Sequence, residues 1–338
     1  MSLVVSKAKA GFKDLPSLGI VSVVRRLEQV FSPRKLYAVL RPIQLTRAVL
    51  NTVFKKNRPG PPVPEFLRSP RNRRTSIADR ETLYFNNILL NFPDRLATPK
   101  WAANCPIDGL QYIESARRAG RLVVLAYFHF GAFPIAHCWL RSKNLPVGGL
   151  VGGFAAMRSR LSRLQDGFLP LPEVPVAMYP EQLRELARFF SGGNVLYLAV
   201  DAPTGKQIVV PFCDGWDFRM ATGAIRFAAR QQADIIPCAI TNEGPWQYRL
   251  TLGRPAPREL LADEANWPQI GQHLLKEMMP LFKAHPHQCW DAMTRRLVRN
   301  TDSEEKLNST RSFIGETIRF APENQRPSAG TFTTAARP

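Results

Sequence analysis

Short apolar runs alternate with segments of helical periodicity through most of this chain, and this alternation limits the folds that it can adopt. Extended patterns lie at residues 121–127, 145–151, 195–200, 208–212 and 234–240, of which 121–127 and 234–240 indicate buried strands, and 246–252 alternates like an edge strand. Helical patterns lie at residues 107–119, 132–141, 181–190, 220–230, 269–282 and 288–299. Strands separated by helices of about ten residues predict an α/β fold, with a mixed, largely parallel sheet flanked by helices.

The N-terminal region, residues 1–75, differs from the rest by its basic charge. Residues 1–100 contain 19 Lys and Arg but only 6 Asp and Glu. From 18 to 56, apolar residues recur at helical spacing among basic ones, and Pro42 is expected to break or kink this pattern. Basic amphipathic helices suit an anionic membrane surface. The same pattern also fits helices that pack on the core and expose a charged face.

Two further boundaries divide the chain. Residues 57–74 contain five prolines and the run Arg71-Asn-Arg-Arg, which predicts a linker, either solvated or in contact with lipid phosphates. The α/β domain is expected over 76–300, and the polar tail 301–338 is expected to be disordered. The N-terminus has no secretory signal pattern, and no run of about 18 apolar residues predicts a membrane span.

Net charge and cysteine content limit the classes of binding partner and the cell compartments that fit the sequence. The formal net charge of +19 favours an acidic partner, which can be anionic lipid, an acidic carrier protein or nucleic acid. The five cysteines are dispersed without a C-x-x-C pair, which fits a reducing cytosol. The sequence also lacks a G-x-S-x-G elbow, a P-loop, an H-E-x-x-H motif and a nucleic-acid recognition module.

His129 is the main candidate for chemistry. In the segment Ala126-Tyr-Phe-His-Phe-Gly-Ala-Phe-Pro134, an apolar strand leads into this histidine, a glycine turn and a helix. Ligand sites of open α/β sheets lie at the carboxyl ends of strands. An imidazole at that position can accept a proton from a hydroxyl at neutral pH. A histidine beside an apolar strand can also be a structural residue.

This segment resembles the His-Phe-Gly-Asn-Trp-Glu motif of the late lipid A (lauroyl and myristoyl) acyltransferases, which belong to the lysophospholipid acyltransferase superfamily. Further stretches are similar to that family in order and spacing, so that the resemblance covers about residues 80–299. They are 193–201 with Gly205, 209–213 leading to 221–228 and 233–237, and 285–290 with Arg295 and Arg296.

The chain departs from the family pattern at one position. The family has an acidic residue five positions after the histidine, where this chain has Pro134. Asp201, at the end of another strand, is a candidate to replace that acid and bond to His129. Alternatively, the fold has lost acyl transfer and serves as a lipid-binding, acyl-carrier-binding or scaffold protein. A separate alternative for Asp201 itself is that it only caps the turn through Pro203 and Gly205.

The resemblance implies an O-acyltransferase with His129 and Asp201 at its catalytic centre. The donor would be an acyl thioester on acyl carrier protein or coenzyme A, and the acceptor a hydroxyl of a membrane lipid such as a lipid A precursor. No metal or other cofactor is expected, and no nucleic acid. The protein is expected on the cytoplasmic face of the inner membrane as a peripheral protein. Phosphate-binding candidates, which can equally be solvated, are Arg158, Arg160, Arg163 and Arg226.

Overall fold

The computed structural model describes most of the α/β region and one long N-terminal helix. The described residues are 26–54, 62–67, 98–149, 193–203 and 205–300, with 23–24, 77–78, 81–82, 85–86, 89, 96, 188 and 190. The tail 301–338 lies outside them. The helix expected over 181–190 is described only at residues 188 and 190, both helical.

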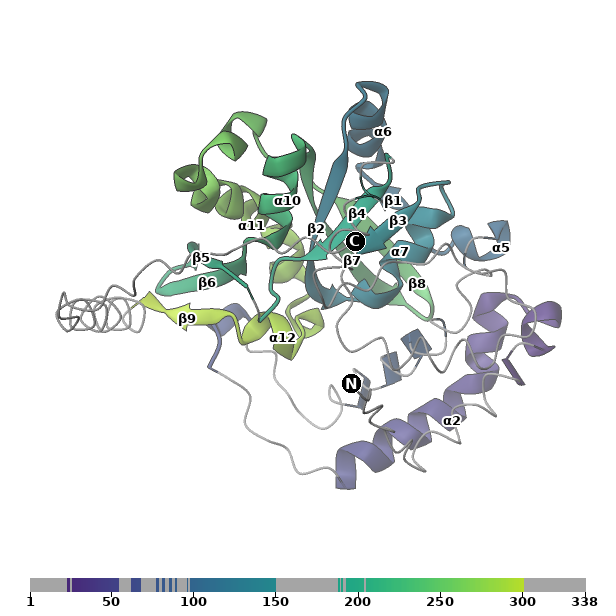
Figure 1. Cartoon of the computed structure of the whole chain (residues 1–338). Coiled ribbons are helices and arrows are strands. Elements are labelled where there is room, and N and C mark those ends of the chain that lie inside the picture. Colours follow the sequence, from purple (N-terminus) through teal and green to yellow (C-terminus); the bar gives the residue numbers. More distant parts are fainter. Residues whose placement is uncertain are drawn as a thin grey trace, which may run out of the picture.

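A six-stranded sheet forms the centre of the molecule (Figure 1). Its strand order is β1-β8-β7-β2-β4-β3, and all neighbours are parallel except the antiparallel pair β7 and β8. The strands are β1 (Ile107–Asp108), β2 (Val123–Gly131), β3 (Val147–Gly149), β4 (Val195–Ala199), β7 (Asp234–Gly244) and β8 (Gln247–Leu252). The predicted largely parallel α/β sheet is confirmed. β8, expected at the edge, is flanked by the two-residue β1.

Helices cover both faces of this sheet. One face packs against α6 (Leu110–Arg118) and α7 (Phe133–Arg141), through a core that includes Leu125 and Ile236. α2 (Pro33–Phe54) adds Leu36 and Leu40 to the same core without lying on the sheet itself. The other face packs against α10 (Gly223–Gln231) and α11 (Trp267–Ala284), through Val124, Ala126 and Phe128. The alternation of side chains along β2 therefore divides two separate cores.

The described structure also contains short elements. They are η2 (Glu65–Leu67), α5 (Pro99–Ala102), η3 (Arg258–Ala262), η4 (Glu264–Asn266), η5 (Pro286–Gln288) and α12 (Asp291–Thr294). The six residues 62–67 fall within the predicted linker and contain only the single turn η2, which agrees with the proline content of that region.

A second sheet of three antiparallel strands was not predicted. It consists of β5 (Gln207–Cys213), β6 (Trp216–Ala221) and β9 (Leu297–Arg299), in the order β5-β6-β9. The expected helix over 220–230 begins only at Gly223, because Met220 is the last inward residue of β6. Trp216, Phe218 and Met220 are buried while the residues between them are partly exposed, a period of two that marks a strand.

The prediction of a helix over 288–299 is also wrong. The segment contains the end of η5, the four-residue α12 and β9 instead. The backbone and side chain of Trp290 are bonded to β2, and the side-chain amide of Gln288 is bonded to β7. These tertiary hydrogen bonds replace the local ones that a continuous helix would need.

Pro42 does not break α2, which runs through it from Pro33 to Phe54. Pro42 is exposed, so water can satisfy the carbonyl that the missing N–H would have bonded. One face of α2 packs on the core through Leu36 and Leu40, and Tyr37 stacks on Phe85 with 3.8 Å between ring centroids. The predicted helix is confirmed, and part of it packs as a structural element.

An ion pair joins the N-terminal ends of the central strands. Asp234 at the start of β7 is 3% exposed, and Arg121 before β2 donates through Nε to both of its carboxylate oxygens, at 3.1 and 3.0 Å. We predict that Arg121→Met lowers the free energy of unfolding by about 1–3 kcal/mol, because the buried carboxylate loses its main donor. Thermal or urea unfolding measures this. Arg230→Met, at an exposed position of α10, is the control and should cost less than about 0.5 kcal/mol.

Candidate active site

His129 and Asp201 meet at the carboxyl ends of β2 and β4. These strands pair in parallel register from Val123↔Val195 to Tyr127↔Ala199, so the residues that follow them reach the same edge of the sheet. His129 Nδ1 lies 2.6 Å from Asp201 Oδ1, and the His129 backbone N–H donates to Asp201 Oδ2 at 2.7 Å. Asp201 thus lies within hydrogen-bond distance of the imidazole, as replacement of the missing acid requires.

The hydrogen bond fixes which ring nitrogen is free. An ionised carboxylate can only accept, so in a neutral imidazole Nδ1 must carry the proton that it donates to Asp201. Nε2 is then unprotonated and can accept a proton from a substrate hydroxyl. The side chain of His129 is 22% exposed, whereas that of Asp201 is 0% exposed. The imidazole is therefore accessible from solvent, and the carboxylate lies behind it.

Asp201 does not cap the turn that follows it in this structure. Both of its carboxylate oxygens are bonded to His129. The turn is held instead by Gln207 Nε2, which donates to the Pro203 carbonyl at 3.2 Å, and by the Thr222 hydroxyl, which donates to the Lys206 carbonyl at 2.9 Å. These hydrogen bonds favour a role for Asp201 as the partner of His129 over a role as the cap of the turn.

Gly131 allows β2 to turn sharply behind His129. Its φ is +54°, and a Cβ at this position would lie 1.9 Å from the Ile240 carbonyl oxygen. The next residue, Ala132, donates its N–H to the same carbonyl at 3.1 Å, and α7 begins at Phe133. Only glycine fits this close approach to β7 without displacing the strand end that carries the histidine.

Trp290 and Gln288 hold the site from the C-terminal side, and the sequence did not reveal this role. The Trp290 backbone N–H donates to the His129 carbonyl at 3.0 Å, and its indole N–H donates to the Gly131 carbonyl at 2.9 Å. The side-chain amide of Gln288 bonds both backbone groups of Asn242 at 2.9 Å. The signal that could have found them was the similarity of 285–290 to a family motif, which gave them no stated function.

Aromatic rings surround the imidazole on the α7 side of the sheet. The ring centroid of Phe133 lies 4.4 Å from that of His129, edge to face, and Trp290 packs on Phe133 at 5.0 Å. Tyr127 stacks on Tyr197 at 4.0 Å, and the Tyr197 hydroxyl donates to the Phe133 carbonyl at 3.1 Å. These contacts limit the positions that the histidine ring can adopt.

Other titratable groups near the pair stay neutral. Burial raises the pKa of Tyr127, and the charge of Asp201 adds to this effect. Burial, with a smaller contribution from Asp201, raises the pKa of the Cys289 thiol to about 12. Burial, with a contribution from Arg141, lowers the pKa of His137 in α7 to about 4. At neutral pH none of these three groups supplies a thiolate, a phenolate or an imidazolium.

Of the four arginines predicted to bind substrate, the structure describes only Arg226. Arg158, Arg160 and Arg163 lie outside the described residues. Arg226 is half-buried in the first turn of α10, which packs on the sheet face opposite to that of Tyr127 and Phe133. Among described residues no cluster of three or more His, Cys, Asp and Glu could hold a metal ion.

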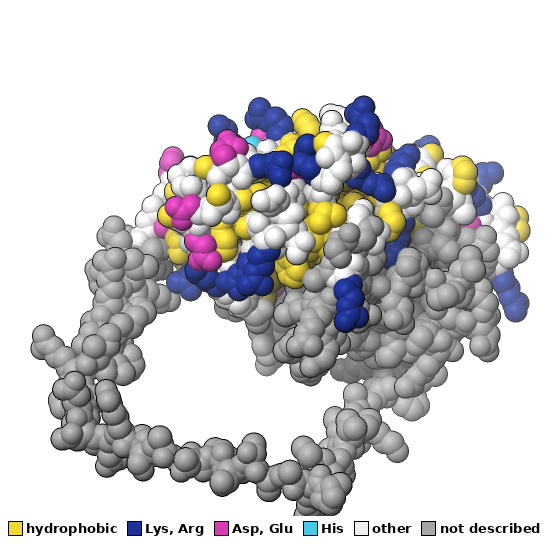
Figure 2. Space-filling view, turned by 45° about the horizontal axis from the view of Figure 1, so that its top comes forward, with side chains coloured by type: hydrophobic (Ala, Val, Ile, Leu, Met, Phe, Trp, Pro, Cys, Tyr) yellow, Lys and Arg dark blue, Asp and Glu magenta, His cyan; other side chains and the backbone are white. Residues whose placement is uncertain are grey.

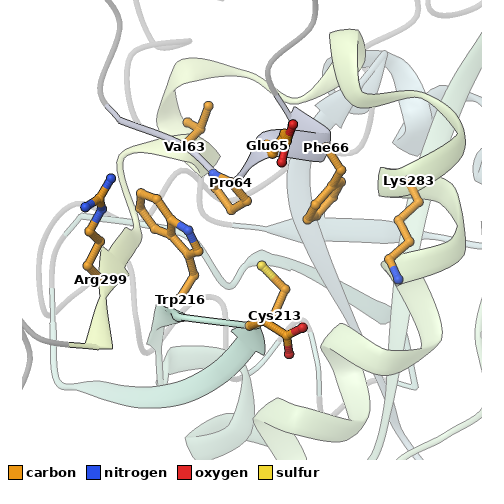
Figure 3. A pocket seen from close by; sticks show the side chains of 9 residues that line it. Val63, Pro64, Glu65, Phe66, Cys213, Trp216, Lys283 and Arg299 are labelled. Carbon is orange, nitrogen blue, oxygen red and sulfur yellow. The ribbon is translucent and has the colours of Figure 1, made fainter.

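An open pocket of about 690 Å³ lies elsewhere, between η2, α11 and the small sheet (Figure 3). The rings of Phe66 and Trp216 face each other across the Cys213 thiol, with Lys283 and Arg299 on opposite sides. Neither His129 nor Asp201 lines this pocket. This pocket is therefore separate from the His129–Asp201 pair.

Comparisons with known proteins agree with the motif pattern. Residues 93–297, more than half of the chain, match the family model described as bacterial lipid A biosynthesis acyltransferase. No curated protein matches the sequence. The solved 1-acyl-sn-glycerophosphate (LPA) acyltransferase PlsC from Thermotoga maritima is 11% identical, with a TM-score of 0.36 over 73% of this chain and 94% of that chain. At this TM-score, nothing further rests on that likeness.

We predict that Gly131→Ala lowers the free energy of unfolding by about 2–4 kcal/mol, because the added methyl group meets the Ile240 carbonyl at a positive φ. Chemical denaturation measures the change. Gly120→Ala is the matched control, since its φ is +68° but nothing lies within 4 Å of its Cβ, so it should cost only about 1–2 kcal/mol. Equal losses at the two positions would contradict a steric role for Gly131.

Proposed function

Because the chain belongs to the bacterial lipid A biosynthesis acyltransferases, we propose that it transfers a fatty acyl group from a thioester to a hydroxyl of a membrane lipid, such as a lipid A precursor. The hydrogen bond between His129 Nδ1 and Asp201 Oδ1, at 2.6 Å, is the contact that supports this reaction most directly. It gives the family's histidine an acidic partner although Pro134 occupies the usual acid position.

In the proposed reaction, Nε2 of His129 removes the proton of the acceptor hydroxyl as its oxygen attacks the thioester carbonyl. Asp201 holds the ring in the required tautomer and stabilises the imidazolium that forms. Backbone amides or an arginine stabilise the oxyanion of the tetrahedral intermediate. The carbon–sulfur bond then breaks, and the imidazolium returns the proton to the leaving thiolate. The products are an ester and a free thiol.

This chemistry requires no metal, no other cofactor and no covalent intermediate on the enzyme. The proposed donor is an acyl group on acyl carrier protein, with coenzyme A as the alternative carrier. Acyl carriers of the first kind are acidic proteins, and Lys and Arg side chains spread over the face of the molecule seen in Figure 2. With a net charge of +19, the chain would attract such a donor electrostatically.

A membrane partner is supported by α2. Val39, Ile43, Leu50 and Val53 are 50–59% exposed and fall on one side of the helix. The helix contains Arg34, Lys35, Arg41 and Arg47 but no acidic residue. An exposed apolar stripe on a cationic helix matches an anionic bilayer surface.

The attachment would be peripheral, on the cytoplasmic face of the inner membrane. No helix in the described part of the chain is long and apolar enough to cross a bilayer. A peripheral position would bring the acceptor hydroxyl, which is embedded in lipid, to a site fed with acyl carrier from the cytosol.

His129→Ala is expected to lower the rate of acyl transfer by about 10²- to 10⁴-fold, because the general base is lost. Asp201→Asn should lower it by at least about tenfold, because the amide no longer fixes the tautomer. The assay uses purified protein, acyl carrier protein loaded with a radiolabelled acyl group, and lipid A precursor. His273→Ala, which changes a partly exposed histidine of α11, is the control and should keep its activity. A rate that is indifferent to His129→Ala would leave the non-catalytic, lipid-binding alternative.

Ile43→Glu together with Leu50→Glu should weaken binding to anionic vesicles by about tenfold or more, because two charges replace exposed apolar side chains. Co-sedimentation with phosphatidylglycerol vesicles measures the bound fraction. The control is the double variant Ala38→Glu and Asn51→Glu, which makes the same charge change at exposed positions outside the four-residue stripe. If both double variants lose binding equally, net charge rather than the apolar stripe holds the protein on the membrane.

A further inference from the structure

Two arginines stand side by side on the outer face of the small sheet. The antiparallel register of β6 and β9 pairs Asp217 with Val298 and Phe218 with Leu297. One position further, Arg219 of β6 lies beside Arg296, the residue just before β9, and the Arg219 N–H donates to the Arg296 carbonyl at 2.9 Å. Side chains directly opposite each other in an antiparallel pair point to the same face, with Cβ atoms about 4.5–5.5 Å apart.

This pair of like charges has no acidic partner in the described part of the chain. No carboxylate oxygen there lies within 4.0 Å of a side-chain nitrogen of Arg219 or Arg296. Asp217 shares the face but forms no ion pair with either guanidinium. Nε of Arg296 is buried without a hydrogen-bond partner. Like charges directly opposite each other destabilise a sheet, and a buried unbonded donor adds to that cost.

The backbone connects the two arginines to the His129–Asp201 pair from two directions. Along β6, Ala221 lies two residues, or about 7 Å, beyond Arg219. The Ala221 N–H donates to the carbonyl of Val200, which precedes Asp201, at 2.7 Å. On the other side, α12 and its C-cap residue Arg295 connect Trp290, which is bonded to His129, to Arg296. Figure 1 shows α12 and β9 extending from the end of β2 to the small sheet.

We propose that Arg219 and Arg296 together bind a phosphate group of one of the two substrates. Each guanidinium can donate two parallel N–H groups to phosphate oxygens, and a dianion between them removes the repulsion of the pair. The inference rests on the proposed function in assuming that the phosphate belongs to a substrate. Two sources fit the chemistry: the phosphate of a lipid acceptor, and the phosphate of the pantetheine carrier on the donor.

Titration calorimetry with the full chain separates these sources. The probes are dihexanoyl phosphatidic acid and 4′-phosphopantetheine, each compared with its phosphate-free counterpart, dihexanoylglycerol and pantetheine. Arg219→Gln and Arg296→Gln should each raise the Kd of at least one phosphate-bearing probe by about tenfold or more. The phosphate-free counterparts should bind all variants alike. The probe that responds identifies the source.

Arg295→Gln is the matched control, because it removes the same charge from the exposed neighbouring residue and should change the Kd by less than about twofold. Arg219→Lys and Arg296→Lys keep the charge but lose the bidentate geometry, so they should also weaken binding. They replace the Gln variants in the titration if a Gln variant is too unstable to measure. The proposal is overturned if neither phosphate probe binds, or if its Kd is the same in wild type and in the variants.

The same titrations in the His129→Ala variant separate this inference from the proposed reaction. Binding does not need turnover, so the dependence on Arg219 and Arg296 should persist when acyl transfer is lost. Loss of transfer with intact arginine-dependent binding supports both proposals. If the protein transfers acyl groups but the Kd of the phosphate probes is unchanged in both arginine variants, only the phosphate site is contradicted.

Discussion

A buried carboxylate bonded twice to one histidine is the interaction on which the rest of the site depends. Asp201 is 1% exposed, and a charge at that depth is tolerated only where hydrogen bonds compensate its lost hydration. Both bonds come from His129, one from the ring and one from the backbone. The histidine is thereby fixed in position and in tautomer, with its second nitrogen turned to the accessible side.

The fold produces this contact from residues 72 positions apart. Parallel pairing of β2 with β4 brings the two strand ends together, and pairing with β7 supplies the carbonyl of Ile240 that only Gly131 can approach. The segment of Gln288 and Trp290 then closes the site from behind. Each support comes from a different part of the chain, so the geometry of the imidazole reports on the integrity of the whole sheet.

The sequence predicted what depends on local pattern. Apolar runs predicted β2, β4 and β7, and the order of motifs predicted that His129 and Asp201 would share one edge of the sheet. The sequence prediction failed where long-range contacts override the local pattern. The Trp290 indole reaches Gly131 across 159 positions, and such a bond leaves no periodic signal near residue 290. The small sheet was missed for a similar reason, because β9 is only three residues long and takes its register from β6.

The tautomer of His129 tests this account most directly. In protein labelled with ¹⁵N-histidine, the signals of His129 can be assigned by their loss in His129→Gln. At a pH where the ring is neutral, the account predicts a protonated Nδ1 and an unprotonated Nε2, with the Nδ1 proton far downfield and lost in Asp201→Asn. A neutral ring that carries its proton on Nε2, unchanged by Asp201→Asn, would contradict the pair as the base of this enzyme.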